Sequence, residues 1–440
     1  MRIVSGYKQA RLLLKREVSS GSYSVSLALK KRLKEMFATE DPEQAVRQII
    51  DEVRSRGDAA LFDYSLKIDQ TELESLDVSR EQVSRAYDKI DPELVSALKL
   101  AAERIRSFHT AQRDAVLSGV ACMSEGTVVR PLERVGIYAP GGTAYYPSTV
   151  LMTAIPAKVA GVKEVILTTP PGPDRAVPAP ALVAADVARV DHIFCLGGAQ
   201  AIAALAFGTE TVPRVDKVCG PGNIFVMLAK KLVFGVVGID GLQGPSEVVI
   251  IADEASNPAY LAAELLAQAE HDTLASAIMI TSSQRLADEV SQEVEKQLAN
   301  LEREAIAAES LANRGMIAVV ANIDEAIELS NLYAPEHLCL DIEGASSYID
   351  RITNAGCIFV GQEPTVVLGD YVAGPSHALP TGGTARFGSP LNITDFIKYI
   401  NVVTIDEANL RELGPAAITI ARAEGLEAHA RAVEKRLERD

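Results

Sequence analysis

The sequence predicts an α/β protein with two Rossmann-like domains, each an incomplete doubly wound parallel sheet, a helical N-terminal segment and an extended C-terminal helical tail. Two observations predict this class. Amphipathic helical periodicity fills residues 41 to 114, and from Val135 onward short β-branched runs alternate with helical runs. A chain of 440 residues is long enough for two or three folding units, each with a buried core.

Helix-start signals mark the leading helical region. Asp41-Pro42 and Asp91-Pro92 each place a capping acid before a proline in the first turn. Two sets of predicted strands follow. The first set consists of Val135–Tyr138, Glu164–Leu167, His192–Cys195 and Val215–Val218. The second set consists of Glu247–Ile251, Ala277–Ile280, Ile317–Val320, His337–Leu340 and Cys357–Val360.

The region 368–391 interrupts this alternation, because it is rich in Gly, Pro and Thr and has little apolar periodicity. Long ordered loops of this kind are usually functional. A charged helix with Glu424 and His429 lies near the end of the chain. We therefore expect an N-terminal segment (1–30), a first α/β domain (31–133 plus 247–390), a second α/β domain (134–246) and a C-terminal tail (391–440).

Composition excludes several classes of function. The chain has 43 Lys and Arg against 59 Asp and Glu, a net charge of −16, and no Trp, which opposes binding to nucleic acid. The five cysteines are scattered, as expected for reduced core residues. Neither a signal peptide nor a transmembrane-length apolar run is present, so we expect no membrane association and a cytoplasmic location.

A group of late side chains has the composition of a metal site. Gln268 and His271 lie three residues apart after a helical run, so one helix could supply two ligands. Asp370 and His429 would add a carboxylate and a second imidazole, with His429 acting in trans if the tail packs on a neighbouring subunit. These donors suit zinc as a Lewis acid. Taken singly, each residue also fits a structural role, since a lone helical His is usually a core or surface residue and Asp370 fits a turn.

Glu336 and His337 follow a proline at the entrance of a predicted strand, where they could share acid–base work near neutral pH. A purely structural role is open for this pair as well. The scarcity of histidine favours function, because four of the six histidines lie in these late motifs, His377 included. His109 and His192 stand apart and receive no role.

Glycine-rich turns follow three strands of the first set. Backbone amides at such turns can hold phosphate or ribose groups, but none of the three matches the dinucleotide-binding G-x-G-x-x-G pattern. Each taken alone is as compatible with a tight turn as with a ligand loop. Three at the same end of one sheet favour a ligand crevice. The turns are Ala139–Gly142, Gly197–Gln200 and Gly220–Asn223.

These motifs, taken in order, resemble the histidinol dehydrogenase family, whose NAD-dependent members perform the last steps of histidine biosynthesis. The resemblance extends from about Asp41 to His429. The segments that carry it are Ala139–Thr143, Gly197–Ile202, Gly220–Asn223, Gly244–Glu247, Gln268–His271, Pro335–Leu338 and Pro380–Arg386.

The resemblance implies one zinc ion per subunit and a homodimer with shared active sites. The implied zinc ligands are Gln268, His271, Asp370 and His429, the last from the second subunit. The implied NAD contacts are Tyr138, Gln200 and Asn223. The implied substrate contacts are Ser246, Gln268, His271, His337, Asp370, Glu424 and His429. The first α/β domain would then carry most zinc ligands, and the second would bind NAD.

The family's reaction is the four-electron oxidation of L-histidinol to L-histidine through L-histidinal, with two NAD. The resemblance implies that His337 is the base that takes the hydroxyl proton and that Glu336 activates the water that adds to the aldehyde. Two departures from the family pattern lie near the expected crevice, in Gly241-Leu242-Gln243 and at Tyr145.

Two alternatives remain open. A relative with the same fold and zinc ligands could oxidise another small polar alcohol, such as a sulfonated diol, because fold does not fix substrate. A metabolite-binding protein without catalysis is the other alternative, although the retained Glu336-His337 pair argues against it.

Overall fold

The computed structural model describes residues 1–16, 25–122, 126–141 and 145–438, without the side chains of residues 121 and 122. The chain forms two compact units. The first unit consists of Met1–Arg113 and Pro131–Ile397, and the second of Asp114–Arg130 and Lys398–Asp440. The first unit contains two parallel sheets, which confirms the predicted fold class. None of the described helices is both long and apolar enough to span a membrane.

A five-stranded sheet in the order β5-β4-β3-β6-β7 lies in one lobe of the first unit. All its pairings are parallel. Its central strands are buried and rich in β-branched residues, as expected when helices cover both faces. Its strands are β3 (Arg134–Tyr138), β4 (Glu164–Thr169), β5 (His192–Cys195), β6 (Lys217–Cys219) and β7 (Gly238–Ile239). Its helices are α7 (Pro147–Ala160), α8 (Ala179–Val187), α9 (Gly198–Phe207) and α10 (Ile224–Val233).

The leading helices complete this lobe. The predicted starts at Asp41 and Asp91 are confirmed, because α3 begins at Pro42 and α6 at Pro92. Leu33, Ile49 and Leu61 share one core with strand residues of the five-stranded sheet. The leading helices are α2 (Leu27–Phe37), α3 (Pro42–Arg56), α4 (Asp58–Asp69), α5 (Arg80–Ala86), the 3-10 helix η1 (Tyr87–Lys89) and α6 (Pro92–Cys122).

This packing differs from the expected division, which joined residues 31–133 to the other α/β domain. Periodicity along a helix shows which face is apolar, but it does not show which sheet covers that face.

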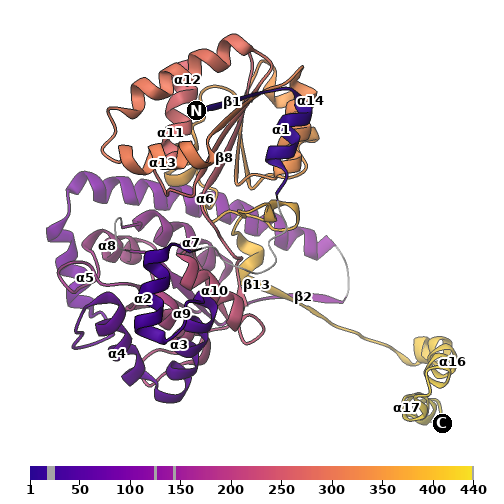
Figure 1. The fold of residues 1–440 in the computed structure, drawn as a ribbon. Coiled ribbons are helices and arrows are strands. Elements are labelled where there is room, and N and C mark those ends of the chain that lie inside the picture. Colours follow the sequence, from indigo (N-terminus) through magenta and orange to yellow (C-terminus); the bar gives the residue numbers. More distant parts are fainter. Residues whose placement is uncertain (17–24, 123–125, 142–144, 439–440) are drawn as a thin grey trace. The chain divides into compact units, whose positions relative to one another are not determined.

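A six-stranded parallel sheet in the order β1-β10-β9-β8-β11-β12 forms the other lobe. Figure 1 shows α11, α12 and α13 on one face of this sheet and α1 and α14 on the other. Its strands are β1 (Arg2–Ser5), β8 (Glu247–Ala252), β9 (Ser276–Thr281), β10 (Met316–Val319), β11 (His337–Asp341) and β12 (Cys357–Val360). Its helices are α1 (Tyr7–Leu14), α11 (Pro258–Ala269), α12 (Gln284–Leu298), α13 (Glu304–Arg314), α14 (Ile323–Tyr333), the 3-10 helix η2 (Ala345–Arg351) and α15 (Val366–Tyr371).

Two features of this lobe differ from the sequence expectation. The first residues form the edge strand β1 instead of a helix, because they pair with β10, more than 300 residues away. The region 368–391 is not free of regular elements, since it begins inside α15 and contains the 3-10 helix η3 (Thr384–Arg386). Local periodicity in the sequence does not indicate either of these features.

A short connection joins the two sheets, from the carboxyl end of a strand in one to the amino end of a strand in the other. β7 ends at Ile239 and β8 begins at Glu247, so seven residues lead from the carboxyl edge of the five-stranded sheet to the amino edge of the six-stranded sheet. In this connection Gly244 N donates to Thr381 Oγ1 at 2.6 Å. A ligand bound beyond the carboxyl ends of β3 to β6 would therefore face the start of β8 and β11.

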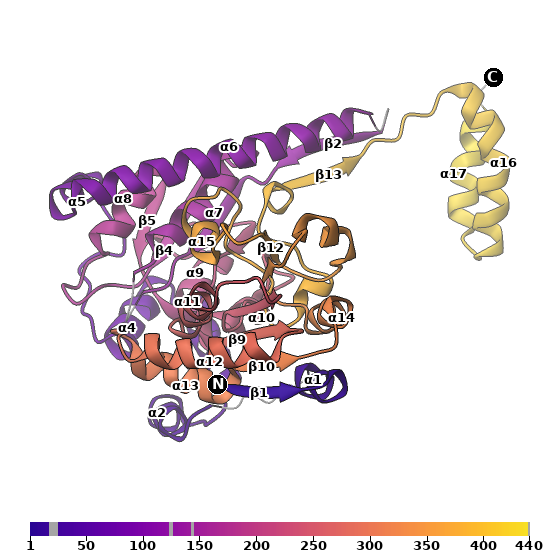
Figure 2. The same ribbon diagram turned by 90° about the horizontal axis from the view of Figure 1, so that it is seen from above.

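The second unit contains a two-stranded sheet and a helical hairpin. The helices α16 and α17 lie side by side (Figure 2), with the left-handed Gly425 in the turn between them. At Gly414 any side chain would lie 3.0 Å from Leu437, so glycine permits the close packing. The elements are β2 (Thr127–Pro131), β13 (Ile397–Asn401), α16 (Glu407–Ala423) and α17 (Glu427–Leu437), and the 3-10 helix η4 (Ile393–Phe396) precedes them in the first unit.

Candidate functional site

Glu336 and His337 lie at the amino edge of the six-stranded sheet. α14 ends at Tyr333, the left-handed Ala334 stops the helix, and His337 is the first residue of β11. β11 pairs with β8, with His337 opposite Val248. Both side chains of the pair are buried. A buried acid beside a buried imidazole is unusual outside functional sites.

The main chain of Glu247 orients this pair. Glu247 N donates to Glu336 Oε2 at 2.8 Å, and Glu247 O lies 3.2 Å from His337 Nδ1. A carbonyl can only accept, so it fixes the hydrogen on Nδ1 and leaves Nε2 as the position that exchanges a proton. Nε2 lies 3.3 Å from Asp370 Oδ1. His337 is therefore in contact with both of the other predicted residues, Glu336 and Asp370.

Electrostatics couple these groups. Burial raises the pKa of Glu336, against the opposing effect of His337. Burial alone would lower the pKa of His337, but Glu336 and Asp370 outweigh it and raise that pKa. Burial likewise opposes ionisation of Asp370, yet the adjacent His337 keeps the pKa of that carboxyl below its usual value. The opposite shifts of the His337 and Asp370 pKa values favour a protonated imidazole beside an ionised carboxylate.

His377 holds Asp370 in place. Its Nδ1 lies 2.8 Å from Asp370 O, and its Nε2 lies 3.2 Å from Thr149 Oγ1 on α7. Burial lowers the pKa of His377, so the ring is neutral at pH 7. Because α7 follows β3, this contact brings the carboxyl edge of the five-stranded sheet to Asp370. The sequence analysis placed His377 among the late motifs but gave it no role.

Gln268 and His271 lie at the carboxyl end of α11. Gln268 is buried, and its Nε2 has no hydrogen-bond partner among the described residues. Desolvation lowers the pKa of His271, although Asp370 opposes this effect, so the neutral imidazole that can ligate a metal is favoured. Ser246 immediately precedes β8, and its carbonyl accepts from Ser276 N at 2.9 Å.

The donors in the first unit fit part of a zinc site. They provide an amide, an imidazole and a carboxylate, from Gln268, His271 and Asp370. No cluster of three His, Cys, Asp or Glu side chains at metal-binding spacing is found among the described residues. Zinc needs four donors in a typical site, so this set requires another ligand.

Glu424 and His429 belong to the second unit. Glu424 is the C-cap residue of α16, and His429 lies in the first turn of α17. Both side chains are exposed. The two residues are therefore close together in sequence, on either side of the turn between α16 and α17.

The glycine turns lie at the carboxyl edge of the five-stranded sheet. Gly142 in the first turn is outside the described residues. In the third turn Gly220 has φ 113°, and a side chain there would lie 2.1 Å from Tyr138 O, which requires glycine. Asn223 caps α10 by accepting from Phe225 N and Val226 N at 3.0 and 3.3 Å. Its amide nitrogen is not used by this cap and is available to a ligand.

Gln200 contacts a residue that the sequence analysis missed, and Tyr138 contacts the second glycine turn. Tyr138 Oη accepts from Gly198 N at 3.2 Å. Gln200 Nε2 donates to Asp69 Oδ2 at 3.4 Å. Asp69 is the last residue of α4, and nothing in the local pattern distinguishes it from a solvated helix end.

A second missed residue, Arg16, supports the acid–base pair from behind. Its guanidinium makes two hydrogen bonds of 2.6 Å to the carboxylate of Glu247 and one of 2.8 Å to Tyr333 O. It also stacks over the Tyr333 ring, with Cζ 3.8 Å from the ring centroid. Because Glu247 orients both Glu336 and His337, Arg16 fixes the backbone on which they depend.

The unusual Gln243 is part of a buried network. Lys230 Nζ lies 2.5 Å from Asp240 Oδ1 and donates to Gly220 O and Gln243 Oε1 at 2.9 and 2.8 Å. Asp240 Oδ2 accepts from Gly220 N at 2.8 Å. Gln243, where the sequence departs from the family pattern, therefore belongs to the network that holds the third glycine turn, on which Asn223 lies.

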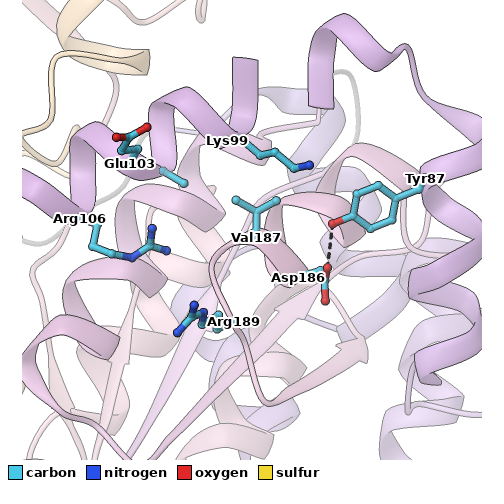
Figure 3. Close-up of a pocket in the computed structure, with 8 residues that line it drawn as sticks. Tyr87, Lys99, Glu103, Arg106, Asp186, Val187 and Arg189 are labelled. Carbon is cyan, nitrogen blue, oxygen red and sulfur yellow. Dashed lines mark hydrogen bonds between the residues drawn. The ribbon is translucent and has the colours of Figure 1, made fainter. Parts of the chain in front are cut away.

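A cavity of about 440 Å³ lies elsewhere, between α6, η1 and α8. Figure 3 shows charged side chains of both signs around it, with Tyr87 bonded to Asp186. None of the predicted site residues lines it. Its lining residues are Tyr87, Lys99, Ala102, Glu103, Arg106, Asp186, Val187 and Arg189.

Comparison with known proteins shows the family of this chain. The family model for histidinol dehydrogenase matches residues 33–437. The histidinol dehydrogenase of Dehalococcoides mccartyi (strain 195) is 55% identical over 438 residues, covering 100% of both chains. That of Clostridium acetobutylicum is 48% identical over 408 residues, covering 92% of this chain and 95% of the relative.

A crystal structure of histidinol dehydrogenase from Elizabethkingia anophelis superposes with a TM-score of 0.88 at 34% identity, covering 100% of this chain and 98% of the other. Similarity of sequence and of fold over the whole chain leads to one conclusion. The chain belongs to the histidinol dehydrogenase family of oxidoreductases, which catalyse the final steps of histidine biosynthesis.

Proposed function

We propose that this protein oxidises L-histidinol to L-histidine through L-histidinal, using two NAD, one water and a zinc ion. The observation that carries the proposal is the contact of His337 with both Glu336 and Asp370, beside Gln268 and His271, in a member of this family. In the first half-reaction the alcohol loses a hydride to NAD and its hydroxyl proton to His337. In the second half-reaction water adds to the aldehyde, and the resulting hydrate transfers a second hydride to the second NAD and releases a proton.

His337 is suited to take the first proton. Its Nδ1 faces the Glu247 carbonyl, so Nε2 is the basic atom and points toward Asp370. Asp370 cannot stabilise an imidazolium and ligate a metal equally well. Metal ligation by Asp370 would therefore bring the pKa of His337 back toward that of a base.

Glu336 is suited to activate the water. Burial raises its pKa, so it is a stronger base than an exposed carboxylate. It lies 3.6 Å from His337 Nδ1, so its charge acts directly on the imidazole. Retaining the aldehyde between the two half-reactions also protects it from side reactions.

We propose that Gln268, His271, Asp370 and His429 hold the zinc ion. When bound, zinc supplies a Lewis acid that orients the amino alcohol and polarises its oxygen. Gln268 and His271 come from one helix end, and Asp370 is held by His377. Ser246 and Glu424 complete the proposed substrate contacts, as in the family pattern.

His429 and Glu424 are proposed to come from the second subunit of a homodimer. The second unit supports this, since it exposes many apolar side chains for its size. A helical hairpin with such a surface is expected to cover it with another chain. The most exposed of these residues are Val403, Ile405, Leu413 and Ile420.

The dimer proposal has a direct test. His429→Ala should be inactive as a homodimer, while mixing with Glu336→Gln chains should restore one intact site per mixed dimer. No recovery of activity in mixtures whose exchange is verified would show that His429 acts within its own chain or has no catalytic role.

NAD is proposed to bind at the carboxyl edge of the five-stranded sheet, in the domain 134–246, with Tyr138, Gln200 and Asn223 as contacts. Glycine at the second and third turns lets the backbone approach a ligand, and the helix starts of α9 and α10 add amide donors. The short connection from β7 to β8 supports a position of this edge near His337.

The experiment that tests the reaction measures NADH formed from L-histidinol by zinc-loaded protein. Two NADH per substrate, abolished by chelator and restored by zinc, are expected. One NADH per substrate would contradict the four-electron reaction. Turnover of a sulfonated diol in preference to histidinol would favour the alternative substrate instead.

A further inference from the structure

Asp69 is a half-buried carboxylate whose side chain has one hydrogen-bond partner among the described residues. That partner is Gln200 Nε2, at 3.4 Å. No cationic side chain lies within ion-pair distance of Asp69 among the residues that the structure describes, and Arg32 acts on it at longer range. Burial raises the pKa of Asp69 to about 6, so the group is ionised at neutral pH and can only accept hydrogen bonds.

The surroundings of Asp69 contain one acceptor without a partner and one unused donor. Gln200 Oε1 is buried and has no partner among the described residues. The Tyr138 hydroxyl oxygen already accepts from Gly198 N, which leaves its own hydrogen free to donate. Buried acceptors without donors are costly, so the cluster is complementary to a ligand that carries hydroxyl groups.

The position of Asp69 is fixed by the end of α4. The left-handed Gln70 stops the helix, and Thr71 Oγ1 donates to Asp69 O at 3.1 Å. Leu61 and Tyr64 of the same helix pack in one core with Tyr138. The carboxylate is therefore presented on a rigid element, as a recognition group requires.

The strand order places this cluster far from the reacting groups. Gln200 follows β5, which is one edge strand of the five-stranded sheet, while β7 at the other edge leads into β8 and the acid–base pair. A dinucleotide whose nicotinamide faces His337 would thus direct its adenosine half toward Asp69.

We infer that Asp69 binds the vicinal hydroxyls of the adenosine ribose of NAD and, by its charge, excludes a 2′-phosphate. This rests on the proposed use of NAD. A carboxylate that accepts from ribose hydroxyls discriminates between NAD and NADP, because a phosphate at the same place is repelled and offers no donor.

The test compares wild type, Asp69→Asn and Asp69→Ser with Asp63→Asn, a matched control on the same helix whose carboxylate pairs with Arg56 at the surface. Binding of NAD and NADP is measured by calorimetry, and kcat and KM with each nucleotide are measured with histidinol. Loss of a charged hydrogen bond predicts about tenfold weaker NAD binding in both Asp69 variants, with kcat nearly unchanged. Binding of NADP should improve, an effect that misfolding cannot produce.

Unchanged NAD affinity and an unchanged ratio of NAD to NADP affinity in both Asp69 variants would overturn the inference while leaving the proposed function in place. A wild-type protein that binds neither nucleotide would overturn the proposed function as well. A shift of the same size in Asp63→Asn would also count against a specific role for Asp69.

Discussion

Lys230 and Asp240 form the most buried ion pair of the described residues, with side chains 1% and 2% exposed. At 2.5 Å their attraction is about 7 kcal/mol for an effective dielectric constant of about 20. Lys230→Met removes this attraction but leaves Asp240 bonded to Gly220 N. We therefore expect a loss of about 3–5 kcal/mol in the free energy of unfolding.

Two further variants separate the pair from its surroundings. In Lys230→Met/Asp240→Asn the new amide can donate to the freed Gln243 Oε1 and still accept from Gly220 N. Most of the loss should then be recovered, leaving less than about 2 kcal/mol. Lys231→Met is the matched control. The Lys231 ammonium lies 3.0 Å from Glu43 at the surface, and this surface ion pair contributes about 1 kcal/mol at most to the free energy of unfolding.

The assay is urea unfolding at neutral pH followed by circular dichroism. A loss no larger than that of Lys231→Met would refute the reasoning, as would a second substitution that adds to the loss instead of offsetting it.

Four further predictions follow from the site. His271→Ala should reduce both activity and bound zinc, with the zinc content falling below about a tenth of the wild-type value in elemental analysis. A full zinc content would show that His271 is not a ligand. In stopped-flow measurements Glu336→Gln should slow histidinal oxidation by about 100-fold or more, but the first hydride step by less than about tenfold. Equal losses in the two steps would contradict the role of Glu336 in hydration. Arg16→Met should lower kcat by about tenfold with zinc retained, because Glu247 loses its bidentate partner; an unchanged kcat would show that the backbone of Glu247 is held without Arg16. Burial raises the pKa of Asp69 to about 6 despite Arg32, so ionisation of Asp69 lowers the stability of the folded protein as the pH rises through that range. The melting temperature of Asp69→Asn should therefore exceed that of wild type by more at pH 8 than at pH 5. Equal differences at the two pH values would argue against this pKa shift.

Much of the fold follows from local pattern. The nine predicted strands correspond to strands of the structure, because buried parallel strands are short β-branched runs bounded by turn residues. The helix starts at Pro42 and Pro92 follow from capping chemistry. Local pattern does not predict β1, since its pairing with β10 joins residues more than 300 positions apart in the sequence.

The candidate site divides in the same way. Glu336, His337 and Asp370 could be proposed from residue type and scarcity, but their contacts of 3.3 and 3.6 Å depend on the pairing of β8 with β11 and on the placement of α15. Arg16 and Asp69 were missed because each lies in a segment with no chemical signature. Their partners, Glu247 and Gln200, are more than 100 residues away in sequence.

The location of the acid–base pair modifies a general rule for α/β proteins. Ligands usually bind beyond the carboxyl ends of parallel strands, and the glycine turns of the five-stranded sheet obey this rule. Glu336 and His337 instead lie at the amino edge of the other sheet. The two arrangements are compatible because only seven residues, 240–246, separate β7 from β8. Since Asp240 and Gln243 of this connection bind Lys230 and the third glycine turn, the same network that stabilises the five-stranded sheet also sets where its ligand edge meets the acid–base pair.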